Sequence, residues 1–188
     1  MTERRGAGTA DGAPGTGVTI IVDGANVVGS RPDGWWRDRA GAAVRLHDNL
    51  ATLAERGHQG IPAGELAASE AAGGVPRSAA AETDAGPGGP GPAPAVPVTV
   101  LLVLEGAARA AAPRIAERAR TAAGTGRREE GAEVQVVSAP GSGDDEIVRL
   151  AQDRAGHCIV VTADRELRRR CVAAGARVAS PSWLYGLL

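Results

Sequence analysis

Four short runs made mostly of apolar residues are the clearest feature of the hydrophobic pattern along the chain. They cover residues 18–22, 98–104, 134–137 and 159–162, and they are rich in Val, Ile and Leu. An unbroken apolar run is typical of a strand that is buried on both faces, as in a parallel sheet. A shorter run at residues 178–179 predicts a fifth strand.

Between these runs, apolar residues recur every three or four positions, which is typical of amphipathic helices. The predicted helices are residues 35–56, 110–123, 143–154, 165–174 and a short helix from Pro181. Ser142 is suited to cap the third of them, and Gly175 to end the fourth. Strands that alternate with helices predict an α/β fold of three layers, with a mostly parallel sheet of four to five strands between the helices.

Two segments lack this periodicity and are enriched in Gly and Pro, with 11 of the 27 glycines and 8 of the 12 prolines. Residues 1–16 are small and polar, so we expect them to be disordered. Residues 61–97 are rich in Ala, Gly and Pro, which predicts a flexible insertion with at most a short helix at 65–72. The sequence therefore predicts one domain over residues 17–188, interrupted by this insertion.

Composition narrows the function classes. The formal net charge is −1, and all 21 basic residues are Arg. This balance argues against a generally basic nucleic-acid coat but leaves room for a local Arg patch. Cys158 and Cys171 lack metal-ligand spacing and are expected to be reduced and buried. With no apolar run of membrane-spanning length and no secretory leader, we expect a cytoplasmic protein that does not enter a membrane.

Acidic residues follow the predicted strands. Asp23 ends the first, Glu105 follows the second, Asp144 and Asp145 follow the third after a Gly-rich loop, and Asp164 follows the fourth. Carboxyl ends of parallel strands lie at one edge of a sheet, where ligands bind. Because crowded carboxylates repel one another, a divalent cation such as Mg²⁺ or Mn²⁺ would neutralise them. Such a cation can also activate a water for attack on a phosphate ester.

Each acid also has a purely structural interpretation. Asp164 could be the N-cap of the following helix, and Asp144 and Asp145 could favour a helix N-terminus electrostatically. Asp23 could belong to an ordinary turn with Gly24, and Glu105 could be a solvated loop residue. Their shared position at one sheet edge favours the metal interpretation.

Three segments with these acids resemble a known family. IIVDGANVVGS, GSGDDEIVRLAQ and CIVVTADREL are similar in order, type and spacing to the motifs of NYN domains, a branch of the PIN-like nucleases, and most of all to small actinobacterial YacP-like proteins. The resemblance implies a PIN-like fold and RNA cleavage by metal-activated water. It implies that Asp23, Asp144 (or Asp145) and Asp164 are catalytic and hold the metal, and that Asn26 shapes the site or contacts substrate. Glu105 departs from it, since many relatives have Asp or no acid there.

Arginines flank two of these motifs. Arg31 and Arg37 follow the first, and Arg165 and Arg168 follow the last, so they could pair with RNA phosphates or simply form solvated helix faces. Trp35 and Trp36 could stack on bases or cover a seam between helix and sheet.

The favoured function is therefore a Mg²⁺- or Mn²⁺-dependent ribonuclease, an endonuclease by preference. A nucleotide hydrolase of the NTP pyrophosphohydrolase kind and a non-catalytic RNA-binding module stay open as alternatives. A homodimer, and partners on the ribosome or in RNA processing, are left open too.

Overall fold

The computed structural model describes residues 17–58, 61–62, 95–96, 98–124 and 134–188. The predicted disordered N-terminus at 1–16 lies outside the described residues. So does most of the predicted insertion, including the short helix considered at 65–72.

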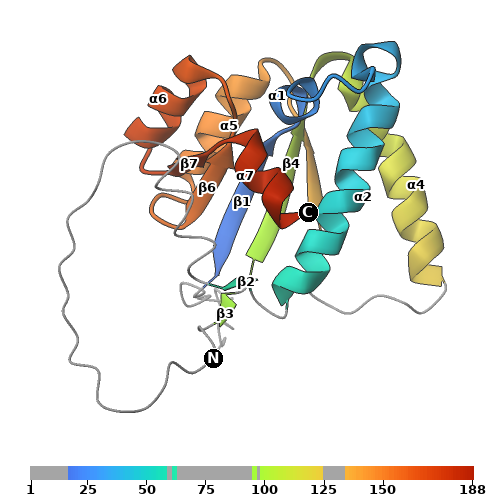
Figure 1. Ribbon diagram of the computed structural model, residues 1–188, viewed down its shortest axis with the longest axis horizontal. Helices are drawn as coiled ribbons and strands as arrows, with labels where there is room; N and C mark the ends of the chain where they lie inside the picture. The colour runs from blue at the N-terminus through green and yellow to red at the C-terminus, as the bar shows by residue number, and fades with distance from the viewer. Residues whose placement is uncertain (1–16, 59–60, 63–94, 97, 125–133) are drawn as a thin grey trace, which may run out of the picture.

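A five-stranded sheet forms the middle layer (Figure 1). Its strands are β1 (Val18–Asp23), β4 (Val98–Leu104), β5 (Val134–Ser138), β6 (Cys158–Val161) and β7 (Arg177–Ala179). They lie in the order β5-β4-β1-β6-β7, and every neighbouring pair is parallel. The predicted α/β class is confirmed, and β1 occupies the centre of the sheet.

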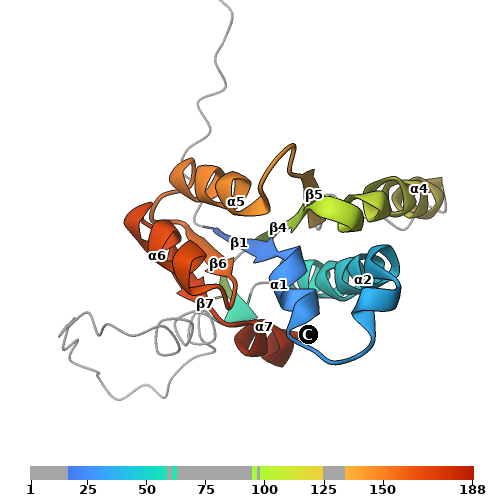
Figure 2. The same ribbon diagram turned by 90° about the horizontal axis from the view of Figure 1, so that it is seen from above.

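Helices cover both faces of this sheet (Figure 2). They are α1 (Gly24–Gly29), α2 (Arg39–His58), α4 (Ala111–Gly124), α5 (Gly143–Gln152), α6 (Arg165–Ala173) and α7 (Pro181–Leu187), with 3₁₀ helices η1 (Trp35–Arg37) and η2 (Gly106–Ala110). Helices α5 and α6 lie on one face, and α2 and α7 on the other. Among the described residues, none of the helices combines the length and the apolar character needed to cross a membrane.

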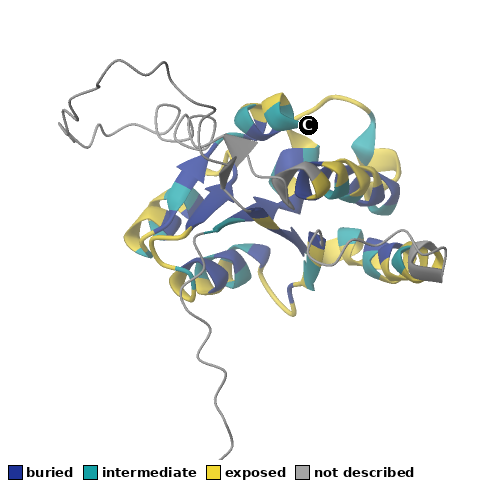
Figure 3. Ribbon diagram, turned by 90° about the horizontal axis from the view of Figure 1, so that it is seen from below, coloured by how far each residue is buried: buried dark blue, intermediate teal, exposed yellow. Residues whose placement is uncertain are grey.

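Burial on both faces explains the unbroken apolar runs (Figure 3). In β1, Ile20 and Val22 belong to the core shared with α2 and α7, while Ile21 belongs to the core beneath α5 and α6. All three side chains are fully buried. Each central strand thus contributes to two apolar cores at once, and the carboxyl ends of β1, β4 and β6 lie at one edge of the sheet.

The structure corrects three sequence predictions. The predicted helix 35–56 is two elements, because Asp38 interrupts it and its Oδ1 accepts a hydrogen bond from the Gly41 N–H at 2.7 Å. The ends of the predicted flexible insertion are paired, since β2 (Ile61–Pro62) and β3 (Ala95–Val96) form an antiparallel ladder. Helix α1 is an additional element that the hydrophobic pattern does not predict. By contrast, Gly175 ends α6 in the left-handed conformation, with φ at 84°, as predicted.

Gly24 allows α1 to start directly after β1. A Cβ at this position would lie 2.6 Å from the Val103 carbonyl oxygen. Because this oxygen belongs to the backbone of β4, it cannot move away without distorting the strand. We therefore expect Gly24→Ala to lower the free energy of unfolding by about 1–3 kcal/mol, the usual cost of overpacking.

Denaturant unfolding tests this prediction, with Gly29→Ala at the other end of α1 as the control. A Cβ there would meet the Trp35 ring at 3.7 Å, an ordinary contact. Equal stability of the two variants would contradict the close approach of α1 to β4.

Candidate functional site

The carboxyl ends of the central strands open into a cleft of about 560 Å³. Four carboxylates line it, from Asp23, Glu105, Asp144 and Asp164, together with the side chain of Asn26. Residues from three strand ends and the first turn of α5 therefore meet at one place, where the sequence analysis placed a metal site.

Asp23 is the most buried of these acids, with 8% of its surface exposed. Its Oδ1 accepts a hydrogen bond from the Asn26 N–H at 3.0 Å, which caps α1, and its Oδ2 accepts one from the Thr162 hydroxyl at 2.8 Å. Burial raises the pKa of Asp23, and the negative charges of Asp144 and Glu105 add to this, while the two hydrogen bonds oppose it. Asp23 is thus held in one orientation but resists carrying an unneutralised charge.

Thr162 joins the two acids on neighbouring strands. This fully buried residue follows β6; its hydroxyl donates to Asp23 and accepts a hydrogen bond from the Asp164 N–H at 3.1 Å. Asn26 makes a second link, because its Oδ1 accepts from the Ala163 N–H at 3.0 Å. Sequence reasoning gave Asn26 a place in the site but missed Thr162, whose only signal was a polar residue closing an apolar run.

Glu105 is not a solvated loop residue. Its Oε2 accepts a hydrogen bond from the Gly143 N–H at 2.8 Å, so it binds the start of α5 from a different strand. Ser142 stands at the N-cap position of this helix, but its side chain makes no capping hydrogen bond. The prediction that the Ser142 side chain caps α5 is therefore wrong. Gly143 is suited to the contact, because a Cβ there would lie 2.7 Å from the same Glu105 oxygen.

Asp144 and Asp145 separate in space. Asp144 lines the cleft, and its pKa is raised by burial and then by the charges of Asp164 and Glu105. Asp145 has a side chain that is 71% exposed and forms an ion pair with Arg170, with Nη2 2.6 Å from Oδ1. The geometry therefore favours Asp144 where the sequence left both residues open.

Asp164 both caps a helix and lines the cleft. Its Oδ1 accepts a hydrogen bond from the Leu167 N–H at 2.8 Å, so it is the N-cap of α6. It also lines the cleft and raises the pKa of Asp144 through its charge. A helix cap uses one lone pair of a carboxylate, and the others stay available for a ligand.

The donor set fits a hard divalent cation that keeps part of its water shell. Within the described ranges, no three Asp, Glu, His or Cys side chains are arranged to hold one ion directly. Mg²⁺ is usually bound through one or two carboxylates and retains several waters, so direct ligation by three is not required. Four carboxylates around one cleft, two with raised pKa, supply the oxygen ligands and charge that such an ion prefers.

The predicted substrate-binding arginines are not part of the cleft lining. The Arg31 guanidinium carbon lies 3.5 Å from the centroid of the Tyr185 ring, a cation–π contact that joins the chain after α1 to α7. Arg37 is exposed in η1, Arg165 is exposed at the first position of α6, and Arg168 is half-buried on the same helix.

Comparisons with known proteins add little to this geometry. The chain is similar to the crystal structure of a single-residue mutant of Rae1 (YacP) from Bacillus subtilis, with 16% identity over 89% of this chain and 72% of that one, at a TM-score of 0.44. No protein-family model matches the sequence, and no curated protein matches it.

The raised pKa of Asp23 predicts how stability depends on pH. A carboxyl whose pKa is higher in the folded state stabilises the fold below its unfolded pKa, and this contribution is lost as pH rises through the folded pKa. Near pH 4 and without metal, the Asp23→Asn variant should therefore melt at the wild-type temperature or below it. Toward pH 7, its melting temperature should rise relative to that of the wild type. Asn retains an acceptor for the Asn26 N–H.

Melting curves at several pH values in a chelator test this expectation. Asp145→Asn, which removes an exposed acid outside the cleft, is the control and should show no such gain with pH. A relative stability of Asp23→Asn that falls between pH 4 and 7 would contradict the raised pKa.

Proposed function

We propose that this protein is a metal-dependent ribonuclease that hydrolyses RNA phosphodiester bonds in the acidic cleft. The observation that carries the proposal is the convergence of Asp23, Glu105, Asp144 and Asp164 on one cleft at the carboxyl edge of a parallel sheet. These acids come from three strand ends and one helix start, so a local structural need of any single element does not explain their meeting.

Charge is the reason to infer a cation. The four carboxylates carry up to four negative charges, and burial together with neighbouring acids raises the pKa of both Asp23 and Asp144. Arg170, the cation that lowers the pKa of Asp144, is held by Asp145 outside the cleft lining. An anionic RNA would be repelled by this cleft unless a bound cation reversed the local charge.

Asp23, Asp144 and Asp164 would hold the Mg²⁺ or Mn²⁺, with Glu105 beside them. When bound, such a metal lowers the pKa of an attacking water and stabilises charge on the phosphate. The chain's own contribution is to orient the ligands: Thr162 and Asn26 fix Asp23, the α6 N-terminus fixes Asp164, and the α5 N-terminus fixes Glu105.

The choice of RNA as substrate is supported by the resemblance of the three acidic segments to NYN domains. Arg165 follows Asp164 at the start of α6, and Arg168 lies one turn further along the same helix. In this proposal they pair with phosphates of an RNA strand that runs past the cleft, as guanidinium groups commonly do.

Metal binding predicts a thermal response that depends on the cleft acids. A cation that binds only the folded state stabilises it by mass action, by about 2.7 kcal/mol at 100 times its Kd. We expect Mn²⁺ to raise the melting temperature of the wild type and to have no effect on the double variant Asp144→Asn, Asp164→Asn. Asn at position 164 can still cap α6, so the metal-free fold should be retained or slightly stabilised.

The matched control is Asp145→Asn, which should keep the full Mn²⁺ response because Asp145 pairs with Arg170 outside the cleft lining. If the double variant kept the wild-type increase in melting temperature with Mn²⁺, the proposed metal site would be wrong. A non-catalytic RNA-binding module would then be favoured.

Cleavage of labelled RNA tests the activity itself. We expect cleavage by the wild type in Mg²⁺ or Mn²⁺, none in chelator, and a loss of at least about 100-fold in Asp23→Asn, as for the removal of a major electrostatic contributor. Pyrophosphate release from NTPs is measured alongside. If the protein releases pyrophosphate from NTPs but does not cleave RNA, it is a nucleotide hydrolase at the same metal centre and not a ribonuclease.

A further inference from the structure

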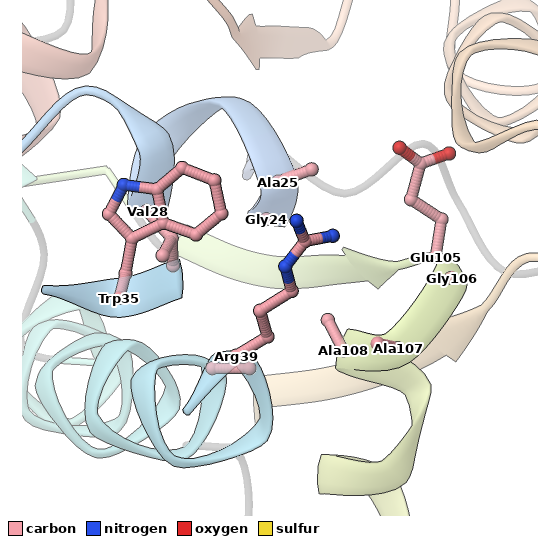
Figure 4. Close-up of a pocket in the computed structure, with 10 residues that line it drawn as sticks. Gly24, Ala25, Val28, Trp35, Arg39, Glu105, Gly106, Ala107 and Ala108 are labelled. Carbon is pink, nitrogen blue, oxygen red and sulfur yellow. The ribbon is translucent and has the colours of Figure 1, made fainter. Parts of the chain in front are cut away.

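A second, smaller cavity adjoins the acidic cleft. It has a volume of about 150 Å³, and both spaces are lined by Ala25 and Glu105 (Figure 4). Gly24, which lines the small cavity, directly follows Asp23 of the cleft. The acidic cleft and the small cavity therefore share part of their wall.

The lining combines an aromatic ring, a cation and apolar walls. Trp35 forms one side, and Val28, Ala43, Ala107 and Ala108 supply much of the apolar surface. Arg39 extends into the space beside Trp35, with its guanidinium carbon 5.3 Å from the centroid of the indole (Figure 4). Such a mixture is typical of pockets for a flat ring with a polar edge, where a few polar groups fix the orientation.

The size of the cavity limits its occupant. Pockets for drug-sized ligands measure about 300–1,000 Å³, so 150 Å³ accommodates a single ring system rather than an entire nucleotide. A ring that stacks between two groups needs about 3.5–4.0 Å on each side, roughly 7–8 Å in all. Since Arg39 is exposed, its side chain is free to move outward by the roughly 2–3 Å that this requires.

We propose that this cavity binds a nucleobase of the RNA substrate, next to the phosphate that the acidic cleft receives. The base stacks on Trp35 and is covered by the Arg39 guanidinium, while its N–H edge faces the Glu105 carboxylate. Glu105 is fixed for this purpose by the Gly143 N–H at 2.8 Å. This inference deepens the proposed ribonuclease function and rests on it for the identity of the ligand.

Trp35 and Trp36 divide between two roles that the sequence could not separate. Their rings meet edge to face, with centroids 6.2 Å apart and an interplanar angle of 83°. Trp35 is half-buried against the cavity, whereas Trp36 is 54% exposed and does not line it. The neighbouring residues therefore form a matched pair, of which only Trp35 should respond to a base.

Fluorescence tests the pocket without relying on catalysis. In a full-length chain carrying Trp36→Phe and Trp183→Phe, Trp35 is the only tryptophan, since the sequence has three. In chelator, adenosine monophosphate should quench the Trp35 emission by stacking, and ribose 5-phosphate, which has no base, should not. Absence of quenching up to about 10 mM, or equal quenching by both probes, would overturn the proposal.

Cleavage kinetics give the second readout. Trp35→Leu should raise KM for RNA at least about fivefold, the lower range expected for loss of one base–aromatic stack, with kcat nearly unchanged. Trp36→Leu should change KM by less than about twofold. The KM of Trp35→Phe should lie between the KM values of Trp36→Leu and Trp35→Leu. Equal effects of the two Leu variants would overturn the assignment.

The two proposals fail separately. Quenching by adenosine monophosphate in a protein that neither binds Mn²⁺ nor cleaves RNA would leave the base pocket standing and remove the ribonuclease. If metal-dependent cleavage is normal but Trp35→Leu leaves KM unchanged, only the base-pocket proposal is wrong.

Discussion

The position of the Asp23 carboxylate is the constraint on which the site depends. It sits at the end of the central strand, almost fully buried, between the Asn26 N–H and the Thr162 hydroxyl. A buried charge is tolerated only when it is hydrogen-bonded or paired, and here the neighbouring groups in the cleft are other acids. The hydrogen bond from the Asn26 N–H requires α1 to start directly after β1, which in turn requires Gly24 against the Val103 carbonyl.

Most of the fold could be predicted because the central strands carry apolar residues on both faces. Ile20, Ile21 and Val22 leave few choices other than a strand covered on both sides. Helix ends were less predictable, since Asp38 stops the chain from continuing one helix through residues 35–56. Helix α1 has only six residues, too short for any periodic signal, and depends on the Asp23 cap and on packing against β4.

The acidic residues of the site could be predicted from their positions at strand ends, but the separate role of each residue could not. Both Asp144 and Asp145 lie in the first turn of α5, and only tertiary packing turns one toward the cleft and the other toward Arg170. Thr162 had only one signal, a polar residue at the end of an apolar run, because its role depends on a partner 139 residues away in the sequence. The capping of α5 by Glu105 is equally non-local, and it replaces the local cap expected from Ser142.

The central claim is that the acids at the sheet edge bind a divalent cation, and crystals grown or soaked with Mn²⁺ test it most directly through anomalous scattering. The account predicts an anomalous peak inside the cleft of Asp23, Glu105, Asp144 and Asp164, with at least one carboxylate oxygen within about 2.0–2.6 Å and waters completing the shell. A well-ordered cleft without such a peak, at a Mn²⁺ concentration that produces peaks elsewhere on the molecule, would contradict it.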